Sequence, residues 1–78
     1  MQRAVTAAGR HTQAIERLIA AKGEDSLPPQ LRETAQLRLQ YPEMSLEELG
    51  MMCDPPLGKS GVNHRMRRLE RMAAELDE

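Results

Sequence analysis

Residues 59–76 read KSGVNHRMRRLERMAAEL, and the rest of the chain is best interpreted around this stretch. Apolar residues recur along it in steps of three and four, which is the spacing of one buried face of an α-helix. The helix dipole favours anions at a helix start and cations at its end, yet the cations here are concentrated in the first half. A polyanion docking at the helix start is the simplest reason for that placement. The predicted buried residues are Val62, Met66, Leu69, Ala73 and Leu76.

Charge is distributed unevenly along the chain. The formal net charge is −1, but residues 59–71 hold five cations and one anion, whereas residues 40–57 hold four anions and no cation. A total near neutrality argues against a non-specific nucleic-acid coat. Local charge decides where a phosphate backbone can lie, and it favours residues 59–71.

Length and composition predict one small all-α domain. Seventy-eight residues are near the lower limit for burying a core without cross-links. Tyr41 is the only aromatic residue, and an aliphatic core suits helices better than strands. Cys53 is the only cysteine, which excludes an internal disulfide and fits a reducing, intracellular setting. No apolar run approaches membrane-spanning length.

Start and stop signals predict four helices. Ser45 and Glu48 form the pattern of a capping box at the start of the third helix. Ser26 and Ser60 are predicted to cap the second and the final helix. The predicted ranges are 2–22, 28–41, 45–53 and 60–76.

The three earlier helices also have predicted core faces. In the first helix they are Val5, Ala8, Thr12, Ile15 and Ile19; in the second, Leu31, Ala35 and Leu39; in the third, Leu46, Leu49 and Met52. Cys53 is predicted to be a small buried residue. The predicted core faces do not explain why methionine stands at positions 44 and 51. An adaptable partner-binding surface would explain both Met44 and Met51.

A short capped helix, a Gly/Pro turn and a longer helix that is basic at its start form the arrangement of a helix-turn-helix. With Val62 at the centre of the buried face, a rotation of about 100° per residue turns the basic side chains outward. The residues predicted to read base edges are Ser60, Asn63, His64 and Arg67. Those predicted to hold phosphates are Lys59, Arg68 and Arg71, with the amides beside Ser45. Basic, solvent-exposed helix faces are common. On charge alone, the alternative is that this face binds no nucleic acid.

Other chemistries are poorly supported by the sequence. Gly58-Lys59-Ser60 resembles the end of a phosphate-binding P-loop, but Cys53 stands where the first glycine belongs. His11 and His64 fall on different predicted helices without a carboxylate or thiol set at metal spacing. No nucleophile–base set or pair of carboxylates points to catalysis. We therefore expect no enzyme activity, metal, cofactor or small-molecule substrate.

Two segments, LP..LR..A.LRL..P..SLEELG at 27–50 and DPP.GKSGVNHRMRRL at 54–69, closely resemble the C-terminal domain of the WhiA family of bacterial transcription regulators. The resemblance implies a helix-turn-helix similar to region 4 of sigma factors, at 24–78, preceded by a linker helix at 1–23. That linker would join it to an N-terminal domain similar to LAGLIDADG homing endonucleases. The DNA-facing residues implied by position are Lys59, Ser60, Asn63, His64, Arg65 and Arg67. Rotation about the helix axis places Arg65 nearer the core edge.

The resemblance also implies a biological setting. It suggests a regulator of sporulation or cell division that acts on double-stranded DNA in the cytoplasm, at the nucleoid. Some members cooperate with an iron–sulfur partner of the WhiB type. The alternative is a protein-interaction module that docks on a sigma factor or another transcription component, for which the acidic segment 43–54 and the spare methionines argue.

Overall fold

The structure is a computed structural model that describes residues 7–76. Those residues form four α-helices and one short 3-10 segment without any strand, which confirms the all-α class. Three helices begin and end within one residue of their predicted bounds, and residues 2–6 of the predicted first helix lie outside the described residues. The elements are α1 (Ala7–Lys22), η1 (Glu24–Ser26), α2 (Pro29–Gln40), α3 (Leu46–Met52) and α4 (Lys59–Glu75).

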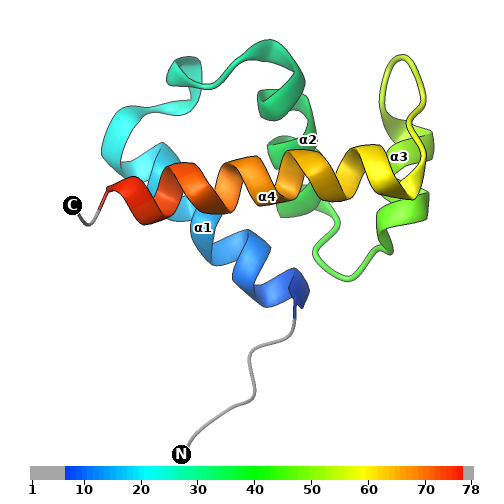
Figure 1. Ribbon diagram of the computed structural model, residues 1–78, viewed down its shortest axis with the longest axis horizontal. Helices are drawn as coiled ribbons and strands as arrows, with labels where there is room; N and C mark the ends of the chain where they lie inside the picture. Colours follow the sequence, from blue (N-terminus) through cyan, green and yellow to red (C-terminus); the bar gives the residue numbers. More distant parts are fainter. Residues whose placement is uncertain (1–6, 77–78) are drawn as a thin grey trace, which may run out of the picture.

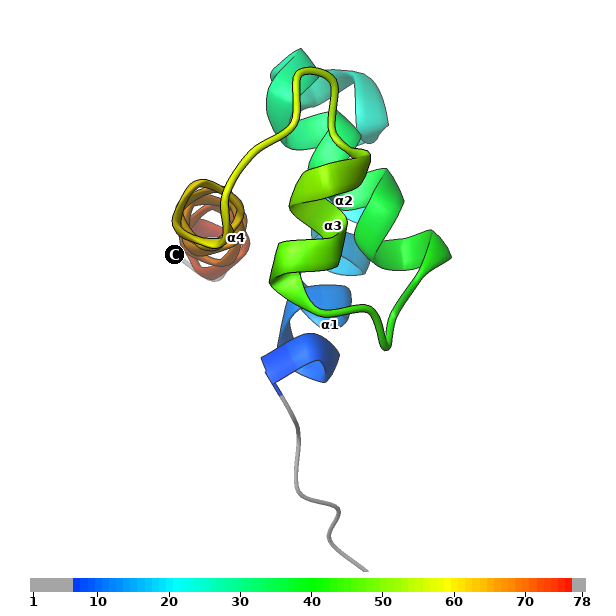
Figure 2. The same ribbon diagram turned by 90° about the vertical axis from the view of Figure 1, so that its right-hand side faces the viewer.

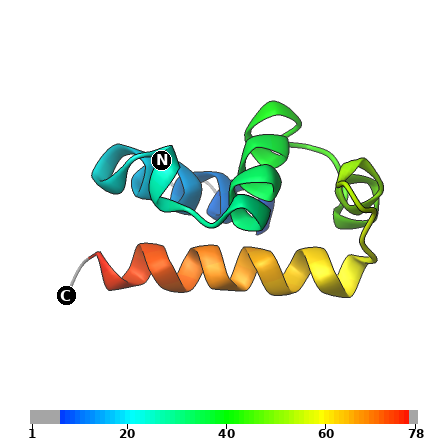
Figure 3. The same ribbon diagram turned by 90° about the horizontal axis from the view of Figure 1, so that it is seen from above.

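Helix α4 lies along one side of the molecule, and the other helices all lie on the same, inner side of α4 (Figures 1 and 3). Helix α1 crosses behind α4 in Figure 1, while α3 lies beside the first turn of α4, to which a short loop connects it (Figure 2). Within residues 7–76, no helix combines the length and the apolar character needed to cross a bilayer. This arrangement leaves the outer face of α4 uncovered.

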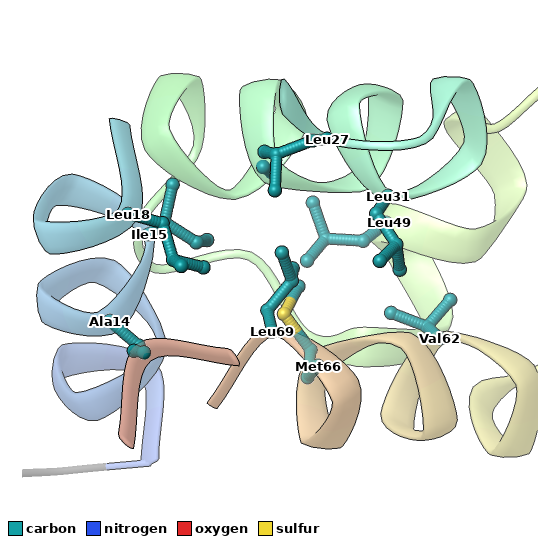
Figure 4. Close-up of a cluster of buried hydrophobic side chains, with 11 residues drawn as sticks. Ala14, Ile15, Leu18, Leu27, Leu31, Leu49, Val62, Met66 and Leu69 are labelled. Atoms are coloured by element: carbon teal, nitrogen blue, oxygen red, sulfur yellow. The ribbon is translucent and has the colours of Figure 1, made fainter. Parts of the chain in front are cut away.

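All four α-helices contribute to one hydrophobic core (Figure 4). The predicted stripe of α4 is confirmed, because Val62, Met66, Leu69 and Ala73 are buried and Leu76 is half-buried. The other members of the buried cluster are Ala14, Ile15, Leu18, Leu27, Leu31, Ala35 and Leu49. Helix α1 therefore packs into the same core as the rest of the chain, and the division at residue 23 stays a prediction about a longer protein.

The buried face of α1 differs from the predicted one. His11, Ala14 and Leu18 are buried with Ile15, whereas Thr12 and Ile19 are only half-buried. Val5 and the side chain of Ala8 lie outside the described part of the chain. Helix α1 is rich in small residues, so the direction from which α2 and α4 pack decides which of its faces is buried.

The predicted helix caps have mixed outcomes. The capping box of Ser45 and Glu48 is confirmed. The Ser26 and Ser60 caps are wrong, because Pro28 and Gly58 are the N-cap residues of α2 and α4. The Ser26 hydroxyl instead donates to the Gly23 carbonyl at 2.7 Å.

Burial on α2 is more polar than predicted. Thr34 and Arg38 are buried, while Leu39 is only half-buried. The Arg38 guanidinium donates to the carbonyl oxygens of Pro42 at 3.1 Å and Met44 at 2.7 Å, and so holds the connection between α2 and α3 in place. Its desolvation by burial lowers the pKa of Arg38.

Two predictions for the methionines are wrong, and the burial of Cys53 is confirmed. Met44 is half-buried and packs against the core, although the sequence offered little reason for its burial. Met52, predicted to turn inward, is 43% exposed, and Met51 is 76% exposed. Helix α3 is short, and only Leu49 and Gly50 of its side facing α4 are buried.

Candidate nucleic-acid interface

The turn between α3 and α4 is closed by a tight backbone approach at Gly50. The Leu57 amide donates to the Gly50 carbonyl at 2.8 Å. A Cβ atom on Gly50 would lie 2.2 Å from the Leu57 carbonyl oxygen and 3.0 Å from Cγ2 of Val62. Only glycine fits this contact, which sets where α4 begins relative to α3.

The start of α4 presents backbone amides without a side-chain cap. Gly58 is the N-cap and has no side-chain hydrogen bond to the helix. The first turn of the helix is closed by the Val62 amide, which donates to the Gly58 carbonyl at 3.2 Å. The amides of Lys59, Ser60 and Gly61 precede that bond, at the end of the helix that carries the positive pole of the dipole. This end of α4 is therefore electrostatically suited to an anion.

The predicted outward residues of α4 lie together on its uncovered face. His64, Arg67, Arg68 and Arg71 are exposed and line a shallow hollow of about 450 Å³. Lys59 and Ser60 are exposed at the helix start, and Asn63 is half-buried at the side, as the helical rotation predicts. The structure therefore places these seven predicted site residues on one helix, and Arg67, Arg68 and Arg71 lie together around the hollow.

Arg65 lies elsewhere, against α2. Its guanidinium Nη1 donates to Oγ1 of Thr34 at 3.0 Å and to the Gln30 carbonyl at 3.3 Å. The same nitrogen lies 3.5 Å from Oε1 of Glu33, and the Arg65 side chain is only 13% exposed. Arg65 thus ties α4 to α2, and its charge is directed away from the outer face.

Ser45 also differs from its predicted role. The Ser45 hydroxyl accepts from the Glu48 amide at 3.2 Å and donates to the Glu48 carboxylate at 3.0 Å. The backbone amide of Ser45 points at the same carboxylate, at 3.4 Å. A phosphate approaching the start of α3 would meet this carboxylate, so the geometry does not favour an anion there.

His11 joins α1 to the second half of α4, a role that its sequence position did not reveal. Its Nε2 lies 3.3 Å from Oε1 of Glu70, and its side chain is buried. Burial lowers the pKa of His11, and the neighbouring Arg38 and Arg10 act in the same direction, while Glu70 opposes them. Among the described residues, no group of three or more His, Cys, Asp or Glu side chains could hold a metal ion.

Comparison with known proteins shows close relatives across most of the chain. The family described as "WhiA C-terminal HTH domain" matches residues 1–73. The chain is 60% identical over 67 residues to the "Probable cell division protein WhiA" of Moorella thermoacetica, which covers 86% of this chain and 21% of that protein. It is 50% identical over 76 residues to the protein of the same name from Clostridium beijerinckii, covering 97% of this chain and 24% of the relative.

A solved structure supports the same relationship. The crystal structure of full-length DUF199/WhiA from Thermatoga maritima superimposes with a TM-score of 0.81 at 34% identity, over 87% of this chain and 23% of that one. The chain therefore spans about a quarter of the length of the relatives that it matches.

Proposed function

This chain belongs to the WhiA family, in which it corresponds to the C-terminal helix-turn-helix domain, and from that premise we propose that it binds double-stranded DNA through α4. The family is of the DNA-binding regulator type rather than an enzyme type. The observation that carries the proposal is the group of exposed cations on the outer face of α4, which none of the other described helices covers.

The length of α4 suggests which of its side chains contact bases and which contact phosphates. Lys59 and Arg71 are separated by about 18 Å along the helix axis. In a helix-turn-helix the N-terminal residues of the second helix contact base edges in the major groove. The first turns of α4 enter the groove, and the second half meets the backbone at its edge. Base edges are read by Ser60, Asn63, His64 and Arg67, and phosphates are held by Lys59, Arg68 and Arg71.

The test begins by selecting bound sequences from random DNA and then measures affinity on the selected site. Arg67→Ala should cost about 1–3 kcal/mol on that site and relax its sequence preference. Arg71→Ala should weaken all sequences to a similar degree and reduce the salt slope by about 1. Lys22→Ala is the matched control, because it removes an exposed cation from the end of α1, away from the outer face of α4.

If neither α4 substitution alters the affinity for any DNA at low salt, the assignment of this face is wrong. A substitution that changes the preferred sequence, in contrast, identifies the side chain as a base reader. Circular dichroism of each variant separates loss of contact from loss of fold.

We extend the proposal to the longer protein of which such a domain is a part. The curated relatives carry the name "Probable cell division protein WhiA". The domain would bring a regulator of cell division or sporulation to promoter DNA at the nucleoid, with a helix-turn-helix used in the manner of region 4 of sigma factors. A mapped binding site upstream of the regulated genes would support this role, and binding confined to sites unrelated to promoters would oppose it.

A second function is favoured by the outer face of α3. Met51 and Met52 are exposed there, next to the exposed carboxylates of Glu47 and Asp54. An acidic surface with flexible apolar side chains suits a partner segment that is both basic and apolar. The proposed partners are an RNA polymerase sigma factor or an iron–sulfur protein of the WhiB type.

The two functions use different faces and can be tested separately. Met51→Gln with Met52→Gln should abolish docking of such a partner and leave binding of the isolated chain to DNA unchanged. DNA binding that is absent in the isolated chain and restored by the partner would favour the second function. Docking that persists in the double variant would remove α3 from consideration.

A further inference from the structure

Helix α2 contacts both sides of the helix-turn-helix through one carboxylate, that of Glu33. Its Oε2 accepts a hydrogen bond at 3.1 Å from the backbone amide of Asp54, the first residue after the C-cap of α3. Its Oε1 lies 3.5 Å from Nη1 of Arg65, which is in the second turn of α4. The two oxygens of one side chain therefore join the end of α3 to α4.

Two further acceptors of α2 hold the Arg65 guanidinium at the same place. Its Nη1 donates to Oγ1 of Thr34 at 3.0 Å and to the Gln30 carbonyl at 3.3 Å. The Thr34 hydroxyl itself donates to the Gln30 carbonyl at 3.0 Å, and Thr34 is fully buried. Hydrogen bonds from a charged donor are stronger than neutral ones, and they gain further strength where water is excluded. Arg65 is thus held in one direction by three groups of the same helix.

This network lies on the side of α4 that is nearly opposite to two proposed base readers. Asn63 and Arg67 are each two residues away from Arg65. Two residues correspond to a rotation of about 200° around the helix axis. Any rotation of α4 at Arg65 would therefore swing both readers through the same angle.

The apolar core and the network constrain α4 in different ways. Burial of Val62, Met66 and Leu69 decides which side of α4 faces inward. The hydrophobic effect that drives this burial is non-directional, and methionine adapts its shape to its surroundings. Hydrogen bonds depend on the angle between donor and acceptor. The contacts of Glu33 and Arg65 therefore add a constraint on the rotation of α4 that burial alone does not supply.

We propose that Glu33 and Arg65 are positioning residues for DNA reading, which fix the rotation of α4 and the end of α3 so that Asn63 and Arg67 meet base edges. The inference rests on the proposed function and adds no contact with DNA. Arg65 acts through α2 and not through a phosphate, and Glu33, whose charge DNA repels, favours specific binding. Positioning and simple charge therefore predict opposite effects of removing the Glu33 carboxylate.

The test measures affinity for the selected site and for a scrambled duplex of equal length, by fluorescence anisotropy over a range of salt concentrations. Glu33→Ala should lower the ratio of the two affinities about tenfold, which is the discrimination that one base contact supplies. If only charge mattered, loss of an anion would raise the affinity for both duplexes. Glu16→Ala is the matched control, because it removes an exposed carboxylate from the middle of α1, and it should leave the ratio unchanged.

Arg65→Met separates positioning from a phosphate contact. It should lower the ratio by a similar factor and leave the salt slope unchanged, whereas loss of a phosphate contact would reduce that slope by about 0.9. Combined with Glu33→Ala, it should lower the ratio by much less than the product of the two single effects, because both side chains belong to one network. Partial unfolding would weaken binding to both duplexes by the same factor, so it leaves the ratio unchanged.

The possible outcomes distinguish the positioning role from the proposed function. If Glu33→Ala keeps the ratio of the intact chain while Arg67→Ala still lowers it, the inference is wrong and the proposed function stands. A reduced salt slope in Arg65→Met would make Arg65 a phosphate contact and would also overturn the inference. An intact chain that binds neither duplex at low salt, or binds both equally, would overturn the inference together with the proposed reading of bases.

Discussion

Replacing Gly50 with alanine tests whether the turn between α3 and α4 is held by backbone contact. The new Cβ would lie 2.2 Å from the Leu57 carbonyl oxygen and 3.0 Å from Cγ2 of Val62. The nearer atom belongs to the backbone, so relief requires the turn itself to move. That movement also strains the bond from the Leu57 amide to the Gly50 carbonyl.

The expected magnitude combines three opposing effects. Overpacking of this kind costs about 1–3 kcal/mol, and loss of the hydrogen bond adds about 1 kcal/mol. Alanine in place of glycine within a helix returns about 1 kcal/mol. Gly50→Ala should therefore lower the free energy of unfolding by about 1–3 kcal/mol, which is a decrease in Tm of about 4–8 °C for each kcal/mol in a domain of this size.

The assay is thermal and urea unfolding followed by far-UV circular dichroism, with Gly61→Ala as the matched control. At Gly61 a Cβ would meet only side-chain atoms of Leu57, at 3.5 Å or more, which is ordinary contact. Gly61→Ala should therefore stabilise the chain by up to about 1 kcal/mol. A Gly50→Ala variant as stable as Gly61→Ala would refute the reasoning that the turn depends on this approach.

Two further predictions concern buried groups in the core. His11→Asn should remove part of the acid sensitivity of the chain. Burial lowers the pKa of folded His11 below its ordinary 6.5, so the unfolded chain binds more protons than the folded chain. The free energy of unfolding therefore decreases as the pH falls through that region. Unfolding measured at about pH 7.5 and about pH 5 should show a smaller decrease in the variant, and an equal decrease would contradict the role given to His11. Arg38→Met should lower the free energy of unfolding by about 2–3 kcal/mol, because carbonyl oxygens after α2, those of Pro42 and Met44, lose their charged donor. Faster amide exchange confined to α3 and the preceding turn would locate the effect, whereas unchanged stability would show that water replaces the donor.

Local features of the fold were predictable from the sequence because they depend on nearby residues alone. The period of the apolar residues in 59–76 identified the buried face of α4 and the direction of its cations. The Ser45–Glu48 capping box needs only two side chains three residues apart. The N-cap residues of α2 and α4, Pro28 and Gly58, were not predicted, because a nearby serine offered a competing cap in each case.

Long-range contacts decided the rest. The Arg38 side chain is buried because the chain after α2 folds back to place its carbonyl groups around it, and no local pattern indicates that. Helix α1 turns His11 and Leu18 inward because α4 packs on that side. Each of these outcomes depends on residues from a different helix.

The cations on α4 illustrate both what the sequence determines and what the tertiary structure determines. The sequence by itself determined the angle at which each side chain leaves the helix, because that angle follows from the number of residues per turn. Only the tertiary structure decided which of these cations remain available, because it depends on what the neighbouring helices place beside them. Thr34 and the carbonyl of Gln30 engage Arg65, whereas no helix within residues 7–76 covers Arg67 and Arg71, which are exposed on the outer face.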